Sequence, residues 1–192
     1  KHLKGMLAHS TISEMGFVLL AMMSGVVAGK ADLLTLENAY SSAMFYVVSY
    51  VLTTLAAFGI ILLLAREGFE SEEISDLAGL NQRSPLYAGV MAVCLLSLAG
   101  LPPLVGFYAK LSVLQILVAS GLPSYIGLAV FAVLMSLVGA FYYLRVIKVM
   151  YFDAPITVST VSAPMDVRVV LTVNGALLLT RGVRPGAPSG LL

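Results

Sequence analysis

Long runs of apolar residues, separated by short polar segments, dominate this sequence. A helix needs about 20 consecutive, mostly apolar residues to cross the hydrocarbon layer of a membrane. Runs of this kind cover approximately residues 6–27, 43–64, 86–118 and 126–147, and a weaker run follows near residues 169–179. The sequence therefore predicts an all-α, polytopic membrane helix bundle with roughly five transmembrane helices.

The composition supports a membrane protein and excludes a soluble domain. Hydrophobic residues make up 59% of the 192 residues and charged residues 11%, whereas a soluble domain is about half apolar and about a quarter charged. The net charge of +1 gives no indication of a nucleic-acid partner, and the lipid bilayer is the expected surrounding. The single cysteine, Cys94, lies in an apolar run, so it is expected to be a small buried hydrophobe, with no disulfide framework and no metal site.

One domain is expected: a helix bundle over residues 1–180, followed by an irregular tail over residues 181–192 that is rich in Gly and Pro. The chain starts without a methionine, and Lys1 and Lys4 precede an apolar run, as in a signal peptide. Polar residues such as Ser10 and Glu14 interrupt that run, and further spans follow. A fragment of a longer protein is therefore the favoured interpretation.

The basic residues predict how the chain is oriented in the membrane. If five spans alternate in direction, most basic residues fall on one side: Lys1, Lys4, Arg66, Arg83, Arg145, Lys148 and Arg168. The other side receives Lys30, Arg181 and Arg184. The positive-inside rule favours the first side as cytoplasmic. The acidic connector over residues 66–83 is then expected to be a solvated cytoplasmic loop that could include a short amphipathic turn.

Two consecutive prolines, Pro102 and Pro103, predict a break in the third span. They remove two backbone donors and free the carbonyls of Leu98 and Ala99. Such carbonyls are tolerated in hydrocarbon only where protein or water meets them, so we expect a discontinuous helix whose break faces a hydrated cavity near the middle of the membrane. Breaks of this kind are the usual place for ion sites in transporters. Two glycines on either side permit an irregular backbone: Gly100 and Gly106.

Lys110 is the one charged residue of that stretch and follows the prolines by about two helical turns. It is expected well inside the membrane, where a charged lysine costs at least ~2.5–3.5 kcal/mol. Burial favours the neutral form, so a lysine at this depth can take up and release a proton. The alternative is a lysine that extends to the membrane interface, but its distance from both ends of the stretch argues against it. Lys110 is therefore the leading candidate for a catalytic, proton-transferring residue.

These features occur in strings that resemble a known family. Gly100-Leu101-Pro102-Pro103, followed by Gly106-Phe107-Tyr108-Ala109-Lys110, resembles the broken twelfth helix of the antiporter-like subunits of respiratory complex I, the NADH–quinone oxidoreductase. Residues 4–17 (KGMLAHSTISEMGF) resemble another helix of these subunits. Residues 76–80 (DLAGL) and 140–146 (AFYYLRV) are similar to the subunit N group in particular. The resemblance covers the chain to about residue 175.

The resemblance implies a bundle of fourteen helices built from inverted repeats, of which this chain would hold helices ten to fourteen. It implies a proton path that uses a glutamate and two lysines on earlier helices. Lys110 would be the twelfth-helix lysine in the outer part of that path and would exchange protons with the outer aqueous side. No NADH, FMN, iron–sulfur or quinone site is implied in this chain, because these groups belong to other subunits. The implied partners are other membrane subunits of complex I, in the inner (plasma) membrane of a bacterium.

Three residues in or just before the first span are further candidates. Lys4 could contribute to a charged axis, or it could anchor the start of the helix on the positive side. Glu14 lies about two turns into the span, where a carboxylate is a functional hypothesis by default, but it departs from the family's sequence. A protonated carboxyl bonded to a serine is the alternative interpretation of Glu14. His9 is the weakest candidate and is more typical of a satisfied interior histidine.

Three functions are compatible with these features. The favoured one is a proton-translocating membrane subunit of NADH–quinone oxidoreductase, which would take no part in the redox chemistry and would not be catalytic alone. A subunit of a multi-subunit cation/proton antiporter shares the broken-helix pattern, but the strings similar to subunit N disfavour it. A structural membrane subunit without a proton path is disfavoured by Lys110.

Overall fold

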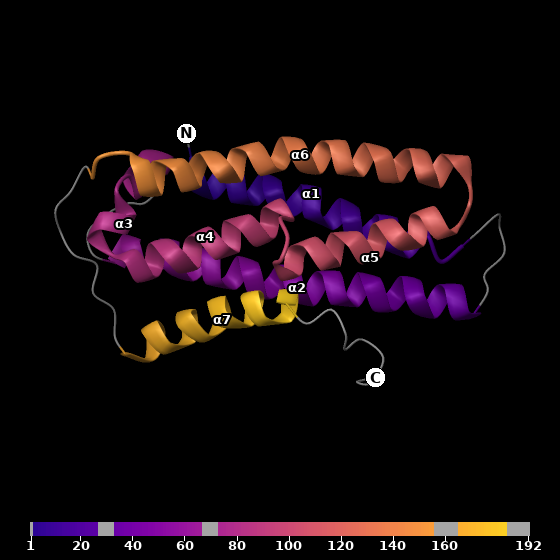
Figure 1. Cartoon of the computed structure of the whole chain (residues 1–192), viewed down its shortest axis with the longest axis horizontal. Helices are drawn as coiled ribbons and strands as arrows, with labels where there is room; N and C mark the ends of the chain where they lie inside the picture. The colour runs from indigo at the N-terminus through magenta and orange to yellow at the C-terminus, as the bar shows by residue number, and fades with distance from the viewer. Residues whose placement is uncertain (1, 27–32, 67–72, 156–164, 184–192) are drawn as a thin grey trace.

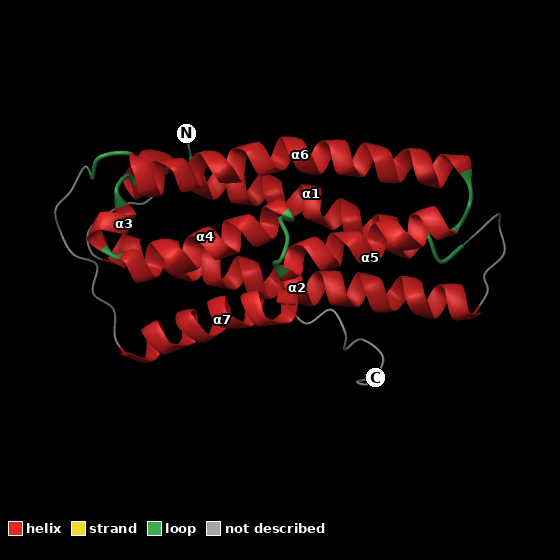
Figure 2. Cartoon of the chain, in the orientation of Figure 1, coloured by secondary structure: helices red, strands yellow, loops and turns green. Residues whose placement is uncertain are grey.

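The computed structural model describes residues 2–26, 33–66, 73–155 and 165–183. Within these four ranges the chain forms helices and no β-sheet (Figures 1 and 2). In chain order the elements are α1 (Leu3–Met23), α2 (Leu33–Arg66), the 3₁₀ turn η1 (Ile74–Leu77), α3 (Leu80–Arg83), α4 (Pro85–Ala99), α5 (Val105–Ala119), α6 (Pro123–Phe152) and α7 (Met165–Val183). The predicted all-α bundle is confirmed.

Three of the described helices are long and apolar enough to cross a membrane, namely α1, α2 over Leu33–Leu64, and α6. The helices α4 and α5 have 15 residues each and are too short to cross alone. They lie end to end between α6 and α2 (Figure 1), so together they form the broken span predicted at the two prolines. The 19-residue α7 lies where the weaker fifth run was predicted and packs against α2 and α4. It is not among the described helices that are apolar enough to cross a membrane, and in Figure 1 it ends near the level of the break between α4 and α5.

The helix α2 is longer than the apolar run that predicted it. It has 34 residues, about 51 Å at 1.5 Å per residue, and begins at Leu33 rather than near residue 43. The added turns contain polar residues such as Glu37 and Asn38, which lower the hydropathy of the segment without preventing a helix. The 30-residue α6 also extends beyond its run, so both helices are longer than the ~30 Å hydrocarbon layer.

The connector between α2 and α4 is more ordered than a solvated loop. Residues 73–83 fold as η1 and α3, and Leu77 and Leu80 are fully buried against the bundle. This half is the short amphipathic turn that the prediction allowed within the loop, and the acidic composition obscured the two apolar side chains that anchor it. Residues 67–72 lie outside the described residues. At the other boundary, α7 continues to Val183, so it includes the first three positions of the predicted tail, and residues 184–192 lie outside the described residues.

The two ends of the bundle agree with the predicted alternation of spans. At one end His2 forms a β-bridge with Glu73, which brings the start of α1 next to the connector before α4. We call this the inner end, because the basic residues predict that it faces the cytoplasm. At the opposite, outer end, the Tyr125 hydroxyl donates to the Val26 carbonyl at 2.8 Å, which joins the start of α6 to the end of α1. The basic residues Lys4, Arg83, Arg145, Lys148 and Arg168 belong to segments near the inner end. Arg66 ends α2 at the inner end, and Arg181 lies in the last turn of α7. The remaining three, Lys1, Lys30 and Arg184, lie outside the described residues.

Buried apolar side chains form two separate cores, one on each side of the α4–α5 break. The inner core joins α1, α2, α4 and α6 through residues such as Leu7, Ile60 and Met91, and it contains the buried free thiol of Cys94, as predicted. The outer core joins α1, α2, α5 and α6 around Phe17 and Val113. The break therefore lies where the apolar packing of the bundle is divided.

Candidate functional site

The helix α4 ends in a turn that favours glycine. Gly100 has φ +76°, a left-handed conformation in which an L side chain is strained. Two prolines follow and have no N–H, so the carbonyls of Leu98 and Ala99 lose the donors that a continuous helix would supply. The chain re-enters a helix at Val105. The predicted break is confirmed.

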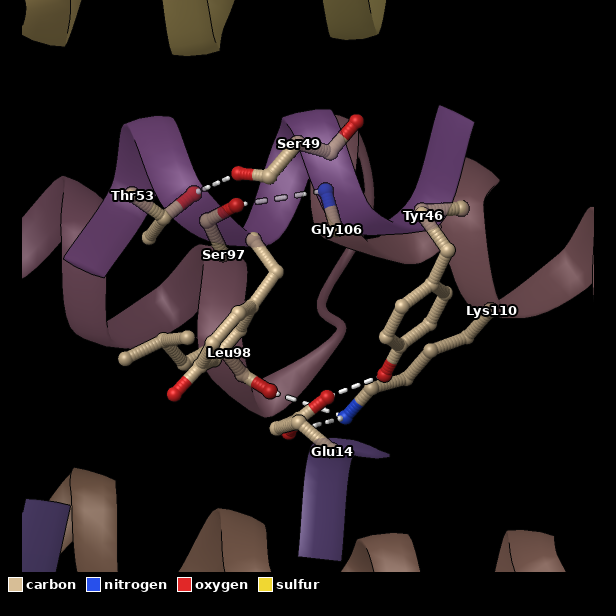
Figure 3. A pocket seen from close by; sticks show the side chains of 10 residues that line it. Glu14, Tyr46, Ser49, Thr53, Ser97, Leu98, Gly106 and Lys110 are labelled. Carbon is tan, nitrogen blue, oxygen red and sulfur yellow. Dashed lines mark hydrogen bonds and ion pairs between the residues drawn. The ribbon is translucent and has the colours of Figure 1, made fainter. Parts of the chain in front are cut away.

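The first turn of α5 packs directly on the last turn of α4, and Gly106 makes this contact possible. Its N–H donates to Ser97 Oγ at 3.2 Å (Figure 3). A Cβ at this position would lie 1.9 Å from the Ser97 carbonyl oxygen, so no residue with a side chain fits without moving the backbone. Gly106 is thus needed for close approach of two helices, and Gly100 for its conformation.

The side chain of Lys110 extends from α5 back toward the break, where acceptors from three other helices surround its ammonium group. Nζ donates to the Leu98 carbonyl of α4 at 2.8 Å, to Ser136 Oγ of α6 at 3.1 Å and to Glu14 Oε1 of α1 at 3.2 Å. These bonds use all three donors of an ammonium group. Lys110 is 8% exposed, so it does not extend to an interface. Water was expected to meet the freed Leu98 carbonyl, but the ammonium group of Lys110 donates to it instead.

Glu14 is the counter-ion of Lys110. It is 6% exposed, and its second oxygen, Oε2, accepts a hydrogen bond from the Tyr46 hydroxyl of α2 (Figure 3). A buried charge is costly unless it is paired and hydrogen-bonded, and both conditions are met here. Of the two nearby serines of α1, Ser10 bonds elsewhere: it is hydrogen-bonded to the Tyr143 hydroxyl. Glu14 thus joins Lys110 at the centre of the candidate site.

An aromatic pair covers the outer side of these two charges. Lys110 Nζ lies 5.2 Å from the centroid of the Phe17 ring, within the ~6 Å over which a cation is attracted to an aromatic face. The Phe17 ring in turn stacks on Tyr46, with centroids 5.5 Å apart. Both rings belong to the outer core, so apolar packing begins directly beyond the ion pair in the outward direction.

A small cavity lies beside the ion pair. It is lined by Glu14, Lys110 and eight neighbours: Tyr46, Ser49, Tyr50, Thr53, Ser97, Leu98, Gly106 and Ala109. Its volume of about 20 Å³ exceeds the ~10–15 Å³ that one water molecule needs. Tyr50 and Thr53 lie one to two turns further along α2 toward the inner end, and the Tyr50 hydroxyl donates to Thr11 Oγ1 at 2.6 Å. The hydroxyl groups that line the cavity therefore lie level with the ion pair or inward of it.

Comparison with known proteins agrees with this arrangement. The family described as "NADH:quinone oxidoreductase/Mrp antiporter, TM" matches residues 1–136, which is more than half of the chain. The chain belongs to this family. The resemblance seen in the sequence is confirmed.

Two similar curated proteins are subunits of bacterial NADH-quinone oxidoreductases. NADH-quinone oxidoreductase subunit N of Polaromonas naphthalenivorans is 68% identical over 97% of the chain, and that of Herminiimonas arsenicoxydans is 57% identical over 96%. The chain spans only 37% and 36% of the length of these relatives. A structure of respiratory complex I from Thermus thermophilus with bound aureothin contains a chain with a TM-score of 0.76 at 29% identity, covering 97% of this chain and 39% of that one.

The two other candidate residues, Lys4 and His9, lie away from the ion pair. Lys4 and His9 are both exposed on α1, and His9 Nδ1 is hydrogen-bonded to the Gly5 carbonyl one turn back at 2.8 Å. Lys4 lies at the inner start of α1, more than two turns from Glu14. The structure therefore brings Glu14 to Lys110 and leaves Lys4 and His9 on the surface of the described chain.

Sequence reasoning missed the polar residues that α2 contributes. Tyr46, Ser49, Tyr50 and Thr53 recur at positions i, i+3, i+4 and i+7, which places them on one face of a helix. A polar stripe inside an apolar span was the signal that could have found them. Ser136 of α6 gives no comparable signal. No three His, Cys, Asp or Glu side chains gather to hold a metal ion in the part of the chain that the structure describes.

Proposed function

We propose that this chain is part of a proton-translocating membrane subunit of an NADH–quinone oxidoreductase and that Lys110 carries protons within it. The observation that supports this most strongly is the buried ammonium group of Lys110 at the helix break, held by Glu14 and by the freed Leu98 carbonyl. Ionisable groups at membrane depth are expensive and mark ion and proton pathways. The chain spans little more than a third of the relatives it matches, so the rest of the path would lie in helices outside it.

In the proposed mechanism, charge changes that arrive from the redox part of the complex alter the protonation of Lys110. The ammonium form is stabilised by its three acceptors and by the negative charge of Glu14. A positive charge nearby, or a proton on Glu14, favours the neutral amine. Release of the proton to the outer aqueous side requires the outer core around Phe17 to open. We assign the described arrangement to a state in which this outward route is closed.

We infer that the partners of the chain are other membrane subunits of complex I and that it lies, as a multi-pass protein, in the inner (plasma) membrane of a bacterium. The support comes from bacterial relatives named as subunit N of this oxidoreductase and from a similar chain in a respiratory complex I. In this proposal NADH, FMN, iron–sulfur clusters and quinone bind to other subunits. The chain then takes no part in the redox chemistry and works only within the complex.

A subunit of a multi-subunit cation/proton antiporter is the alternative function, because the family description includes Mrp antiporters. The names of relatives up to 68% identical favour the oxidoreductase. Deleting the gene separates the two functions. Loss of coupled NADH–quinone reductase activity supports the oxidoreductase, whereas loss of sodium/proton antiport with normal NADH oxidation supports the antiporter.

The proposed function is tested by Lys110→Met in the complete complex, purified and reconstituted into liposomes. Methionine removes the titratable group and keeps a chain of similar length, so we expect NADH-driven quinone reduction to continue while proton translocation per electron falls clearly. The control is Lys148→Met, which removes an exposed lysine paired with Asp153 at 3.8 Å at the inner end of α6. Normal translocation by an assembled Lys110→Met complex would show that Lys110 is a structural anchor.

A further inference from the structure

We propose that Glu14 is a second proton-carrying residue, which takes a proton from Lys110 and returns it, and that Tyr46 positions its carboxylate for this transfer. The proposal rests on the proposed function, because it adds a step to the proton path through Lys110. It originates in the direct contact between the two buried charged groups at the helix break (Figure 3).

The distance and the hydrogen bonds around the pair suit a direct transfer. Lys110 Nζ lies 3.2 Å from Glu14 Oε1, which is within hydrogen-bond reach for proton transfer. After the transfer, the neutral amine keeps two N–H groups, and two acceptors remain for them: the Leu98 carbonyl and Ser136 Oγ. One N–H bond breaks and one O–H bond forms on Oε1. The new carboxylic acid then donates to the lone pair of Nζ, so every group keeps a partner.

Burial gives the transfer a physical reason. The charged pair gains Coulomb attraction, but the cost of removing two charges from water can exceed that gain. The neutral pair avoids this desolvation cost and keeps the hydrogen bond between the two groups. Glu14 and Lys110 are only 6% and 8% exposed, so the desolvation cost applies to both groups.

Tyr46 fixes the orientation of the Glu14 carboxylate. Its hydroxyl donates to Glu14 Oε2, and its ring is held against Phe17 in a stacked arrangement with an interplanar angle of 10°. The carboxylate is therefore fixed at one oxygen and presents Oε1 to the ammonium group. Tyr46 acts through Glu14 and is a positioning residue.

The small cavity beside the pair gives a protonated Glu14 a partner for proton exchange. Both residues line the cavity, which has room for one water molecule and is also lined by the hydroxyl-bearing residues Ser49, Tyr50 and Ser97. A water molecule there can exchange a proton with the Glu14 carboxyl. On the other side, Phe17 covers the ammonium group. A proton on Glu14 thus has a route into the cavity that does not require the Phe17 side to open.

A permanent counter-ion would occupy the same place without changing its own protonation. The two roles differ in one measurable property. A proton carrier becomes a carboxylic acid during turnover and then has a C=O stretching band in an infrared difference spectrum. A counter-ion remains a carboxylate throughout and contributes no such band.

The experiment uses the complete complex, reconstituted into liposomes, with Glu14→Gln, Glu14→Asp and Tyr46→Phe. The control is Glu37→Gln, which alters an exposed carboxylate at the outer end of α2. We expect Glu14→Gln to lose most of the proton translocation per electron, while quinone reduction continues, and to lack a C=O band that the unaltered complex and the control both have. Glu14→Asp should retain that band at a shifted frequency. Tyr46→Phe should also shift the band and should translocate fewer protons per electron.

Normal translocation by Glu14→Gln, with Lys110→Met impaired, would overturn the role of Glu14 and leave the proposed function standing. Normal translocation by both variants would overturn both proposals. If Glu14→Gln does not assemble, the spectrum of Glu14→Asp decides the matter. A C=O band that is unchanged in Glu14→Asp, or absent from the unaltered complex, would identify Glu14 as a permanent counter-ion and overturn the proposal.

Discussion

Gly106→Ala tests the geometry of the helix break, because it adds a single methyl group where two helices touch. The new Cβ would lie 1.9 Å from the Ser97 carbonyl oxygen and 2.9 Å from Ser97 Oγ, whereas Cβ atoms essentially never come within 3.0 Å of another heavy atom. The obstacle is backbone, so a rotated side chain cannot relieve it. The start of α5 must move away, which strains the packing and breaks the hydrogen bond from Gly106 N–H to Ser97 Oγ.

The expected cost of Gly106→Ala is the sum of these two effects. Overpacking costs ~1–3 kcal/mol and the lost hydrogen bond ~1 kcal/mol, so we expect a total destabilisation of ~2–4 kcal/mol. The assay is the thermal unfolding midpoint of the purified complex, together with the amount of this subunit that assembles. The matched control is Gly89→Ala in the middle of α4, where a Cβ meets no heavy atom within 4 Å and alanine favours the helix by ~1 kcal/mol.

We expect the Gly106→Ala complex to assemble poorly or to unfold at a lower temperature, and the Gly89→Ala complex to match or slightly exceed the unaltered one. Equal stability of the two variants would refute the close contact between α4 and α5. It would also remove the main support for the position of Lys110, because that position depends on how α5 begins.

Three further predictions concern topology, packing and autonomy. Cysteines introduced at Ser75 and Ser124 should react with an impermeant reagent from opposite sides of the membrane, while the buried Cys94 should not react. Labelling of both from the same side would contradict the alternation of spans. Asn174→Ala should increase amide hydrogen exchange in α7, because Asn174 Nδ2 donates to the Leu52 carbonyl at 3.1 Å and hydrogen bonds between helices in membranes average ~0.6 kcal/mol. Unchanged exchange would show that this bond does not hold α7 against α2. The isolated chain, reconstituted into vesicles, should neither oxidise NADH nor carry protons, and activity above empty vesicles would contradict its role as one part of a larger path.

Local chemistry explains why the break and its lysine could be predicted from the sequence. Two prolines free two carbonyls in any helix, and a lysine two turns away in an apolar stretch has to lie at membrane depth. What the sequence could not supply was the partner of the Leu98 carbonyl. The flexible Lys110 side chain turns back to it, and that depends on the packing of α5 against α4 through Gly106.

The composition of the site could not be predicted in the same way, because it depends on contacts between distant segments. Glu14 and Lys110 are 96 positions apart, and nothing in either local sequence specifies that α1 and α5 lie side by side. The local sequence around Glu14 was compatible both with a functional carboxylate and with a protonated carboxyl bonded to a serine. The polar stripe of α2 could have been recognised from its spacing, whereas Ser136 becomes visible only when α6 is placed against α5.

The most direct test of the central claim, that Lys110 carries protons, is the number of protons translocated per electron by a Lys110→Arg complex. Arginine keeps the positive charge and can still bond to Glu14, but its guanidinium group does not deprotonate in proteins. We expect assembled Lys110→Arg complexes, reconstituted into liposomes, to reduce quinone and to translocate clearly fewer protons per electron than the unaltered complex. A ratio equal to that of the unaltered complex would contradict the claim, because a fixed charge would then be sufficient at this position.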